Sequence, residues 1–319
     1  MKLAIYKDTF ANNRGADIAV KNLAEGLVER GHSVTLFTKD EFAAKVHGDY
    51  DIIISTGTNE ILDLAKVKGL PPIVQQFHTD PAYPFRHWIK KWKRNRAIKA
   101  ALRKVAAIQV LREEHRETLK KLGISAPRVE VIGNWSSFET NIRSTTTIRN
   151  YNSKIILCPG ALNKDKNQKL LVDAFRTIAA DFPDWEVHLY GKGKPTFKPH
   201  PQVKLKGYAD LAEPYATCAF VAFPSKTEGF GLVIADAAAF GKPALCIKDW
   251  IGCGLVVPGT VPAFAAGLRK LMTDVAYREA LGAASHDYCA SHYSRRAILE
   301  KWEDVLHPYS TGGMWESGS

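Results

Sequence analysis

The segment from Pro224 to Leu245 contains residue types that can bind a phosphorylated ligand. A carboxylate, Glu228, is followed by a glycine-containing turn, and a helix is predicted from about Gly231 to a stop at Gly241 and Pro243. Glycines let backbone approach a ligand closely, and the free N–H groups at a helix start attract an anion such as a diphosphate. We therefore expect a binding turn made of Gly229, Phe230, Gly231 and Leu232, with the amides of residues 230–232 facing the anion.

Two carboxylates near this turn could orient hydroxyl groups. Glu228 lies beside the expected phosphate, and Asp236 follows about one and a half turns along the predicted helix, on a neighbouring face. One carboxylate can meet a sugar and the other a ribose. The simpler alternative is a strand–turn–helix junction whose acidic residues only favour a helix start. The combined pattern with Gly241-Lys242-Pro243 favours binding.

These residues resemble the signature of the family 4 glycosyltransferases. That signature is a Glu, usually followed by Gly-Phe-Gly-Leu, with a second acidic residue eight positions after the first. Here Asp236 stands where the family usually has Glu. The exchange withdraws the carboxylate by about 1.5 Å, so its ribose contacts would be longer or bridged by water.

The resemblance implies a GT-B fold, in which two Rossmann-like, doubly wound parallel-sheet domains face a cleft. It also implies a retaining glycosyltransferase that takes its sugar from a nucleotide-sugar donor and needs neither a bound metal nor another cofactor. It spans both halves of the chain and is most specific over residues 154–245. Glu228 would then hold donor-sugar hydroxyls, and Asp236 would hold the ribose.

A second basic loop follows the apolar run that ends at Cys158. In the family this loop usually carries an Arg after its glycine and a Lys before the next helix, and both clamp the diphosphate. Lys166 matches the Lys, but Ala161 stands in place of the Arg. Losing a fork-shaped cation removes bidentate phosphate contacts that a lysine cannot fully replace. Lys164 could substitute for the missing charge. A solvated basic loop is the alternative for both lysines.

The first half of the chain supplies weaker matches. Gly15 opens a predicted helix after residues 12–14, as the family's glycine-rich loop does, and could admit the donor phosphate. His78 follows the apolar run 72–77, where family members often have a histidine that contacts the donor sugar near the reacting carbon. A structural role stays open for both residues. The resemblance thus implies Glu228, His78 and Lys166 as the catalytic residues.

The elements that position these residues follow a regular order. Apolar runs at 2–6, 33–38, 51–55, 72–77, 107–111 and 129–133 alternate with helical stretches, including one from Gly15 to Arg30. A second series runs through 154–158, 186–190, 203–207, 219–223, 243–247 and 254–257, with helices at about 167–180 and 231–240. Continuous apolar strands separated by helices predict two α/β units, each with a parallel sheet covered on both faces.

The polar stretch 138–153 is predicted to link two domains, and 319 residues exceed what one core usually contains. We expect an acceptor domain over 1–145 and a nucleotide-sugar domain over 151–293, with helices after Val261 and Ala276. A helix over 294–307 could cross back to the first domain, and 308–319 is expected to be disordered.

Composition narrows the class of protein. The net charge of +11 favours a polyanionic partner, which could be nucleic acid, anionic lipid or a phosphate-bearing substrate. The five cysteines form no CxxC pair and match no zinc spacing, which favours a reducing compartment. The chain has no long apolar run that could span a bilayer, and its start is typical of a first strand rather than of a signal peptide. A cytoplasmic protein is therefore expected.

The stretch from Phe85 to Lys104 is basic and aromatic. Trp88 and Trp92 recur at helical spacing, with Lys90, Lys91, Lys93 and Arg94 among the cations around them. Such a helix suits an anionic bilayer surface, which would place the protein peripherally on the inner face of the plasma membrane. Alternatively, the tryptophans pack into the domain and the cations are solvated. Nucleic acid is not expected, because no binding motif accompanies the charge.

Other functions stay open. A catalytically inactive GT-B module that binds a membrane or protein partner would explain Ala161 and Asp236, and also Trp135, which stands where the family usually has Gly. An NAD-dependent oxidoreductase is disfavoured because no GxGxxG follows a predicted strand, and an epimerase finds no support in the Glu228 segment. The donor could be UDP-, GDP- or ADP-linked. The basic surface and the resemblance favour a glycan or lipid-linked acceptor and a role in the synthesis of bacterial envelope polysaccharide.

Overall fold

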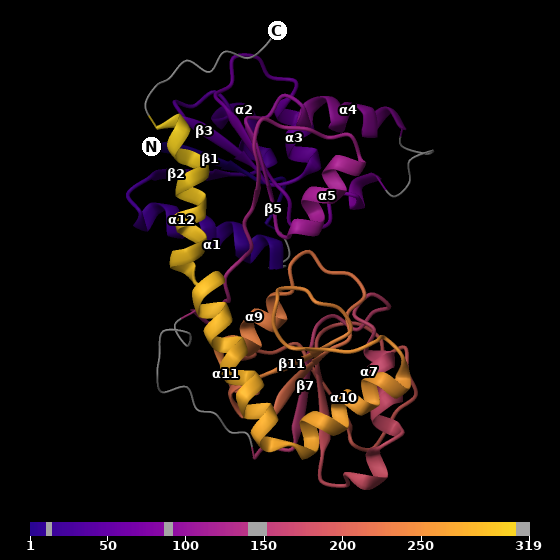
Figure 1. Cartoon of the computed structure of the whole chain (residues 1–319). Coiled ribbons are helices and arrows are strands. Elements are labelled where there is room, and N and C mark those ends of the chain that lie inside the picture. Colours follow the sequence, from indigo (N-terminus) through magenta and orange to yellow (C-terminus); the bar gives the residue numbers. More distant parts are fainter. Residues whose placement is uncertain (11–14, 86–91, 140–151, 311–319) are drawn as a thin grey trace. The chain divides into compact units, whose positions relative to one another are not determined.

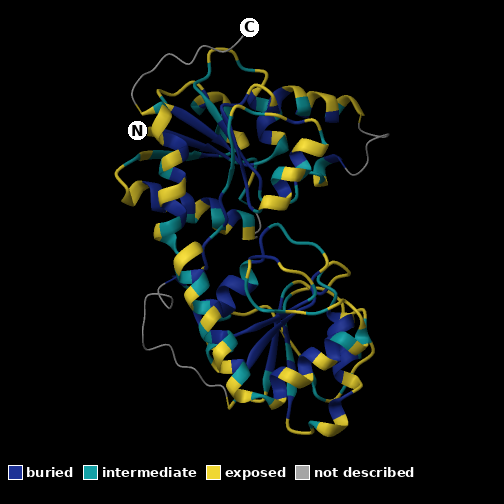
Figure 2. Ribbon diagram, viewed as in Figure 1, coloured by how far each residue is buried: buried dark blue, intermediate teal, exposed yellow. Residues whose placement is uncertain are grey.

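The computed structural model describes residues 1–10, 15–85, 92–139 and 152–310. Its contacts divide the chain into two units, of which the first is Met1–Asn134 together with the segment from Arg295, and the second is Trp135–Ser294. Figure 1 shows the elements of each unit around a twisted sheet. The strands are mostly buried and the outer helix faces are exposed (Figure 2).

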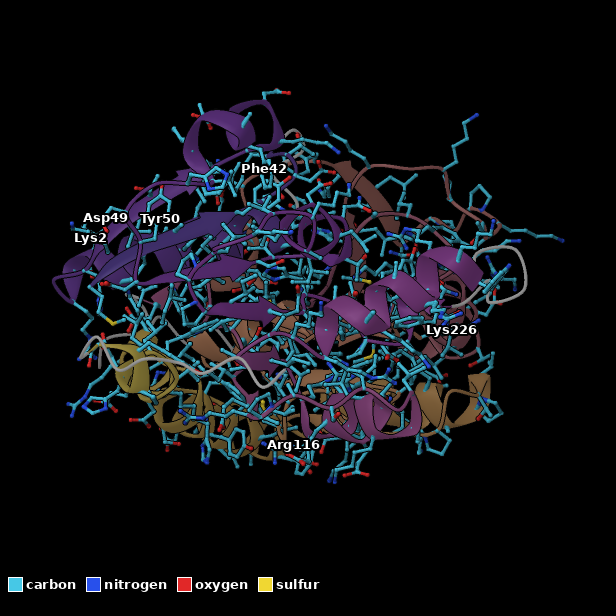
Figure 3. The ribbon with its side chains drawn as sticks, turned by 90° about the horizontal axis from the view of Figure 1, so that it is seen from above. Lys2, Phe42, Asp49, Tyr50, Arg116 and Lys226 are labelled. Carbon is cyan, nitrogen blue, oxygen red and sulfur yellow. The ribbon has the colours of Figure 1, made fainter. Side chains whose placement is uncertain are left out.

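The first unit contains a six-stranded parallel sheet in the order β2-β1-β3-β4-β5-β6. Its strands are β1 (Lys2–Tyr6), β2 (Ser33–Phe37), β3 (Ile52–Ser55), β4 (Ile73–Gln76), β5 (Ala107–Val110) and β6 (Val129–Val131). Every residue of β3 is buried, as expected for a strand covered on both faces. At the amino end of β1, Lys2 pairs with Asp49 (Figure 3). Because the sheet is parallel, the loops that follow its strands lie at the opposite edge.

Helices of the first unit cover this sheet. They are α1 (Gly15–Glu29), α2 (Phe42–Lys45), α3 (Thr58–Leu64), α4 (Trp92–Leu102), α5 (Glu113–Lys121) and α12 (Arg295–Leu306), with 3₁₀ turns η1 (Lys39–Glu41), η2 (Tyr83–Phe85) and η5 (His307–Tyr309). The chain's last helix, α12, packs on α1. A Cβ on Gly26 would lie 2.8 Å from Leu299, and Arg295 pairs with Glu29 at 2.8 Å. The C-terminal helix therefore belongs to the first unit.

The second unit has a six-stranded parallel sheet in the order β12-β11-β10-β7-β8-β9. Its strands are β7 (Ile155–Pro159), β8 (Glu186–Tyr190), β9 (Val203–Gly207), β10 (Phe220–Phe223), β11 (Ala244–Cys246) and β12 (Leu255–Val256). Its helices are α7 (Gln168–Arg176), α8 (Ala212–Thr217), α9 (Leu232–Ala239), α10 (Val261–Thr273) and α11 (Val275–His292), with the 3₁₀ turn η4 (Ala179–Asp181). The prediction of two parallel α/β sheets is confirmed.

Two boundaries differ from expectation. The helix expected over 167–180 ends at Arg176, and the Thr177 hydroxyl donates to the Ala174 carbonyl at 2.7 Å, competing with continuation of the helix. The second unit begins at Trp135 rather than near 151, because residues 135–139 pack with the second sheet. The Phe138 ring lies 5.1 Å from Phe240, edge to face. Residues 140–151 and 311–319 lie outside the described residues.

Membrane-spanning helices were not expected. In the part of the chain that the structure describes, no helix is both long enough and apolar enough to cross a bilayer.

Candidate donor-binding site

The loops that follow β7 and β10 meet at the centre of the second sheet. These strands are neighbours, but the chain continues from β7 to β8 on one side and from β10 to β11 on the other. Ligands of open α/β sheets bind at such a switch point, outside the carboxyl ends of the strands. The two loops are residues 160–167 and 224–231, and both were singled out from the sequence.

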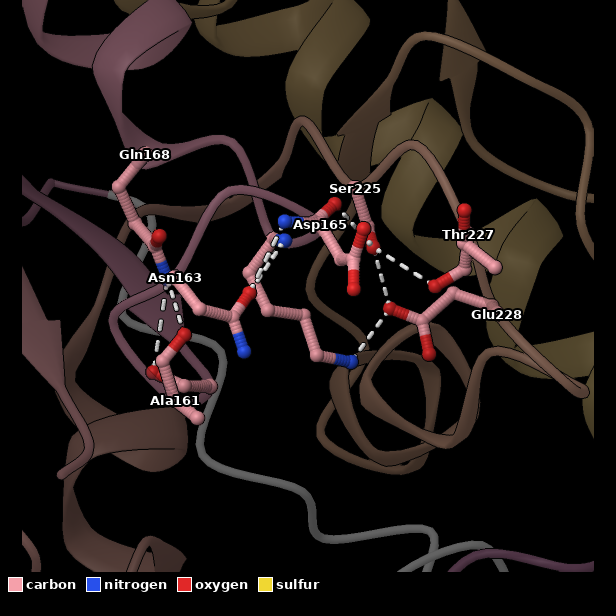
Figure 4. A network of polar contacts seen from close by, with 9 residues as sticks. Ala161, Asn163, Asp165, Gln168, Ser225, Thr227 and Glu228 are labelled. Atoms are coloured by element: carbon pink, nitrogen blue, oxygen red, sulfur yellow. Dashed lines mark hydrogen bonds and ion pairs between the residues drawn. The ribbon is translucent and has the colours of Figure 1, made fainter. Parts of the chain in front are cut away.

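Lys166 and Glu228 lie together across this switch point, with the Lys166 Nζ 2.5 Å from Glu228 Oε1. The Ser225 hydroxyl donates to the same Glu228 oxygen, also at 2.5 Å (Figure 4). The side chains keep 27% and 13% of their surface exposed. A cation and a carboxylate are thus held at the strand ends, where they can exchange partners with a phosphate and a sugar hydroxyl.

The backbone of the β7 loop fixes Lys166. The Asn163 side-chain oxygen accepts from the Lys166 amide at 2.9 Å, and Asn167 adopts the left-handed conformation with a φ of 55°. Asn167 Nδ2 donates to the Pro224 carbonyl at 3.2 Å, and the Lys226 amide donates to the Asp165 carbonyl at 2.8 Å. The two loops are therefore bonded to one another, which restricts how far the lysine can move.

The turn before α9 requires glycine at position 231. Gly231 has a φ of 110°, and a Cβ there would lie 3.1 Å from Trp250. It is the residue that caps α9, and a glycine cap has no side chain to accept from the first-turn N–H groups as Ser or Asp would. An external anion can take that place. Phe230 is buried with its ring 5.0 Å from Tyr293, so it anchors the turn.

Asp236 is bonded within the second unit. The Asp236 carboxylate accepts from the Ser136 hydroxyl at 2.7 Å and from the Ser137 amide at 3.1 Å. Its burial raises the pKa of the carboxyl to about 6, against the lowering effect of these two bonds. Although the resemblance implied a ribose contact for this residue, here its carboxylate faces the segment that follows β6.

The other expected donor contacts are distributed over both units. Lys164 is exposed on the β7 loop, and the carbonyl of Ala161 accepts from Gln168 at 3.0 Å. Gly229 and Leu232 are partly exposed at the α9 turn. Gly15 is the exposed first residue of α1 in the first unit. Lys164, Lys166 and the turn 228–232 thus lie at one edge of the second sheet.

His78 follows β4 at the carboxyl edge of the first sheet. Among the described residues, neither of its buried ring nitrogens has a hydrogen-bond partner. Burial, with a smaller contribution from Lys7, lowers the pKa of this imidazole to about 3, and Asp17 opposes the shift. The side chain is therefore neutral near pH 7, with one nitrogen able to donate and the other able to accept.

The β8 loop supports this edge and was not singled out from the sequence. The Leu162 amide donates to the Lys192 carbonyl at 2.8 Å, and a Cβ on Gly191 would overlap the Gly160 carbonyl oxygen. The signal that could have found it is the Gly-x-Gly of residues 191–193, placed directly after an apolar run. Ser225, which bonds Glu228, carried no comparable signal.

The expected basic helix is described only in part. Trp88, Lys90 and Lys91 lie outside the described residues. In α4 the Trp92 side chain is half exposed and Lys93 is exposed, whereas Arg94 donates to Asn59 of α3 at 2.8 Å. Arg94 therefore joins two helices of the first unit.

No metal centre was expected. Within residues 1–10, 15–85, 92–139 and 152–310, no group of three or more His, Cys, Asp and Glu side chains is placed to hold a metal ion.

Sequence comparison identifies a known domain in the second unit. Residues 153–274 match the family model described as Glycosyl transferases group 1. The amylovoran biosynthesis glycosyltransferase AmsD of Erwinia amylovora is 23% identical over 218 residues, which are 62% of this chain and 61% of that protein. The D-inositol 3-phosphate glycosyltransferase of Kineococcus radiotolerans is 37% identical over 92 residues, or 24% of this chain and 21% of that protein. The aligned regions thus leave a substantial part of each relative unmatched.

Solved structures resemble the whole chain in fold. Sucrose-phosphate synthase from Thermosynechococcus elongatus gives a TM-score of 0.79 at 16% identity, covering 98% of this chain and 100% of that one. Anabaena Alr3699/HepE in complex with UDP and glucose gives 0.73 at 17% identity, covering 96% and 99%. Residues 153–274, which contain the whole second sheet, are therefore similar to the group 1 glycosyl transferases, and each of the two units has a Rossmann-like parallel sheet as in the GT-B fold.

Proposed function

We propose that the protein is a retaining, metal-independent glycosyltransferase that moves a sugar from a nucleotide-sugar donor to a glycan or lipid-linked acceptor. The observation that carries this proposal is the Lys166–Glu228 pair at the switch point of the second sheet, inside the matched domain. A UDP-linked donor is favoured because HepE, which shares the fold, was solved with UDP-glucose.

In this mechanism the leaving diphosphate is stabilised by Lys166 and the first amides of α9. Such preorganised donors act where negative charge develops and need no reorganisation during the reaction. Without donor, Lys166 Nζ bonds Glu228 Oε1. When the diphosphate binds, the lysine exchanges the carboxylate for phosphate, and Glu228 is left to accept from a sugar hydroxyl while Ser225 keeps it oriented.

The proposal that the anomeric configuration of the sugar is retained rests on the resemblance to family 4 enzymes. We assign no covalent nucleophile, because the acceptor hydroxyl attacks from the face that the diphosphate leaves, through an ion-pair-like state. His78, as a neutral imidazole, is the candidate contact for the donor sugar or the incoming hydroxyl. A ribose contact from Asp236 requires its carboxylate to leave the Ser136 hydroxyl and the Ser137 amide.

Substitution of the central pair tests the proposal. Lys166→Ala and Glu228→Ala are each expected to lower kcat for sugar transfer by roughly 100-fold or more, as loss of a transition-state donor does. Lys169→Ala is the matched control, because Lys169 is exposed and pairs with Asp173 one turn away. Transfer from UDP-, GDP- and ADP-sugars is followed by nucleotide release. Full activity in both pair variants would refute the site.

An inactive GT-B module is the second candidate function. Ala161 in place of the family's Arg and the bonded state of Asp236 favour it. Calorimetry with UDP, GDP and ADP distinguishes the active transferase from the inactive module. The enzyme must bind one of these nucleotide products, whereas an inactive module need not bind any.

We also propose that the protein acts at the cytoplasmic face of a bacterial membrane, where it transfers sugar to an acceptor in envelope polysaccharide synthesis. The half-exposed Trp92 beside Lys93 supports membrane contact, and the AmsD relative is named for a polysaccharide pathway. Trp92→Ala with Lys93→Glu is expected to reduce co-sedimentation with anionic liposomes. Lys121→Glu, which makes the same charge change at an exposed site on α5, should reduce it less. Equal loss in both variants would remove the specific role of α4.

A further inference from the structure

Two thiols of the second unit lie in contact. Cys253 is in the loop between β11 and β12, Cys289 is near the end of α11, and their sulfur atoms are 3.9 Å apart. Cys253 is partly exposed, whereas Cys289 is fully buried. The neighbouring thiol and burial both raise the pKa of Cys289. An oxidant from solvent therefore meets Cys253 first.

Two glycines flank Cys253 in this loop. Cys253 stands between Gly252 and Gly254, which have φ values of 84° and 102°. A disulfide requires a sulfur separation of about 2.05 Å, so the two sulfurs must approach by side-chain rotation or by a shift of the backbone. Because Cys289 is held in a regular helix, any backbone shift falls on the Cys253 loop.

The same loop packs against the turn assigned to the donor diphosphate. A Cβ on Gly231 would lie 3.1 Å from Trp250 and 3.6 Å from Ile251. The end of α11 also reaches this turn, because Tyr293 contacts Phe230. A shift of the Cys253 loop toward α11 would also shift Trp250 and Ile251, which lie against the Gly231 turn whose backbone amides an anion would use.

We propose that Cys253 and Cys289 form a reversible disulfide that weakens donor binding. A peroxide oxidises the Cys253 thiol to a sulfenic acid and is reduced to water or an alcohol. The Cys289 sulfur then attacks the sulfenic sulfur, the S–S bond forms, and the sulfenic hydroxyl leaves as water with the Cys289 proton. A dithiol restores both thiols by exchange and is itself oxidised to a disulfide.

The first experiment maps the bond in the full chain. After treatment with hydrogen peroxide and blocking of free thiols, digestion and mass spectrometry should find the peptides of Cys253 and Cys289 joined with the loss of two hydrogen atoms, and dithiothreitol should separate them. Cys253→Ser should abolish the product. Cys218→Ser, at a buried cysteine of the same unit, should retain it. Absence of the joined peptides, or a bond from Cys253 to Cys246, overturns the proposal.

The second experiment measures UDP affinity by calorimetry before and after oxidation, and this step rests on the proposed function. We expect about fivefold weaker binding in the oxidised chain, a typical coupling between sites, and no change in oxidised Cys253→Ser. A joined chain with unaltered UDP affinity overturns the regulatory role. A reduced chain that binds no nucleotide contradicts the proposed donor site instead, while the mapped bond stands independently.

Discussion

At the scale of single residues, Asp236 carries the clearest electrostatic signature. Its carboxyl group is 9% exposed, and burial raises its pKa to about 6. The charged form is therefore less stable in the folded protein than in the unfolded chain. In the unfolded chain the same group ionises near its ordinary value of 3.8. The folded state therefore binds a proton that the unfolded state releases throughout the interval between these two values.

This difference predicts a pH dependence of stability. Because the folded pKa is raised, the contribution of Asp236 is fully present below pH 3.8 and is lost as pH rises through 6. Compared with Asp236→Asn, the wild-type free energy of unfolding should gain about 2 kcal/mol as pH falls from 8 to 4.5. Urea denaturation across this range measures the difference, and a difference that does not vary with pH would contradict the assignment.

Ser136→Ala provides a second test of the same group. Removing a hydroxyl that donates to the Asp236 carboxylate should raise the pKa of the carboxyl further, since that bond favours its charged form. The pH interval over which stability changes should therefore move upward in this variant.

Of the residues singled out from the sequence, Lys166 and Glu228 lie together, while Asp236 has protein partners that its position in the motif does not reveal. Motif spacing reports which residues share a turn or helix face. It does not report that Ser136, 100 positions away, supplies a competing donor.

At the scale of elements, the close approach of two strand-end loops depends on a glycine. Gly191 follows β8 with a φ of 154°, and its amide donates to the Gly207 carbonyl at 2.7 Å. The position of its missing Cβ is occupied by the Gly160 carbonyl oxygen, at the start of the loop that presents Lys166. Any side chain here must push the two loops apart.

Gly191→Ala should therefore destabilise the second unit by roughly 2 to 4 kcal/mol, through backbone strain and overpacking. It should also weaken UDP binding, because Lys166 is displaced. Gly259→Ala is the matched control, since its Cβ would meet only Ile247 at ordinary contact distances of 3.5 Å or more. Thermal unfolding with and without UDP measures both effects. Equal midpoints for the two variants would show that the loops do not need this close approach.

Several strands were predictable to the residue because apolar runs bounded by polar residues are a local signal. Strands β1, β8 and β9 have the limits that the sequence indicates. Helix α3 and helix α5 were not located, since α5 has few apolar residues, and His115 and Leu119 are its buried positions. Its amphipathic pattern is too sparse to separate from a charged loop.

At the scale of the whole molecule, the last helix returns to the first unit. Trp302 is 2% exposed in α12, and the His32 ring lies 3.0 Å from Glu303 of the same helix. The chain thus enters the second unit after Asn134 and leaves it before Arg295. The stability of the first unit depends on residues at the far end of the sequence.

Trp302→Ala should therefore destabilise the first unit selectively, by about 3 to 5 kcal/mol for a buried aromatic side chain. Hydrogen–deuterium exchange followed by mass spectrometry should find faster exchange in peptides of α1 and β1 than in the wild type, with little change in peptides of β7 and β10. Lys301→Ala, at an exposed neighbour in the same helix, serves as control. Similar acceleration in both units would contradict the division.

The sequence alone determined the fold class, the strand positions to within one or two residues and the turn that carries Glu228, because helix and strand periodicity and glycine positions are local properties. Only the tertiary structure decided which distant residues meet. Lys166 and Glu228 are 62 positions apart and pair because β7 and β10 are neighbours, and α12 joins the first unit because its apolar face is buried there. Strand order and packing depend on contacts between remote segments, and no local pattern records them.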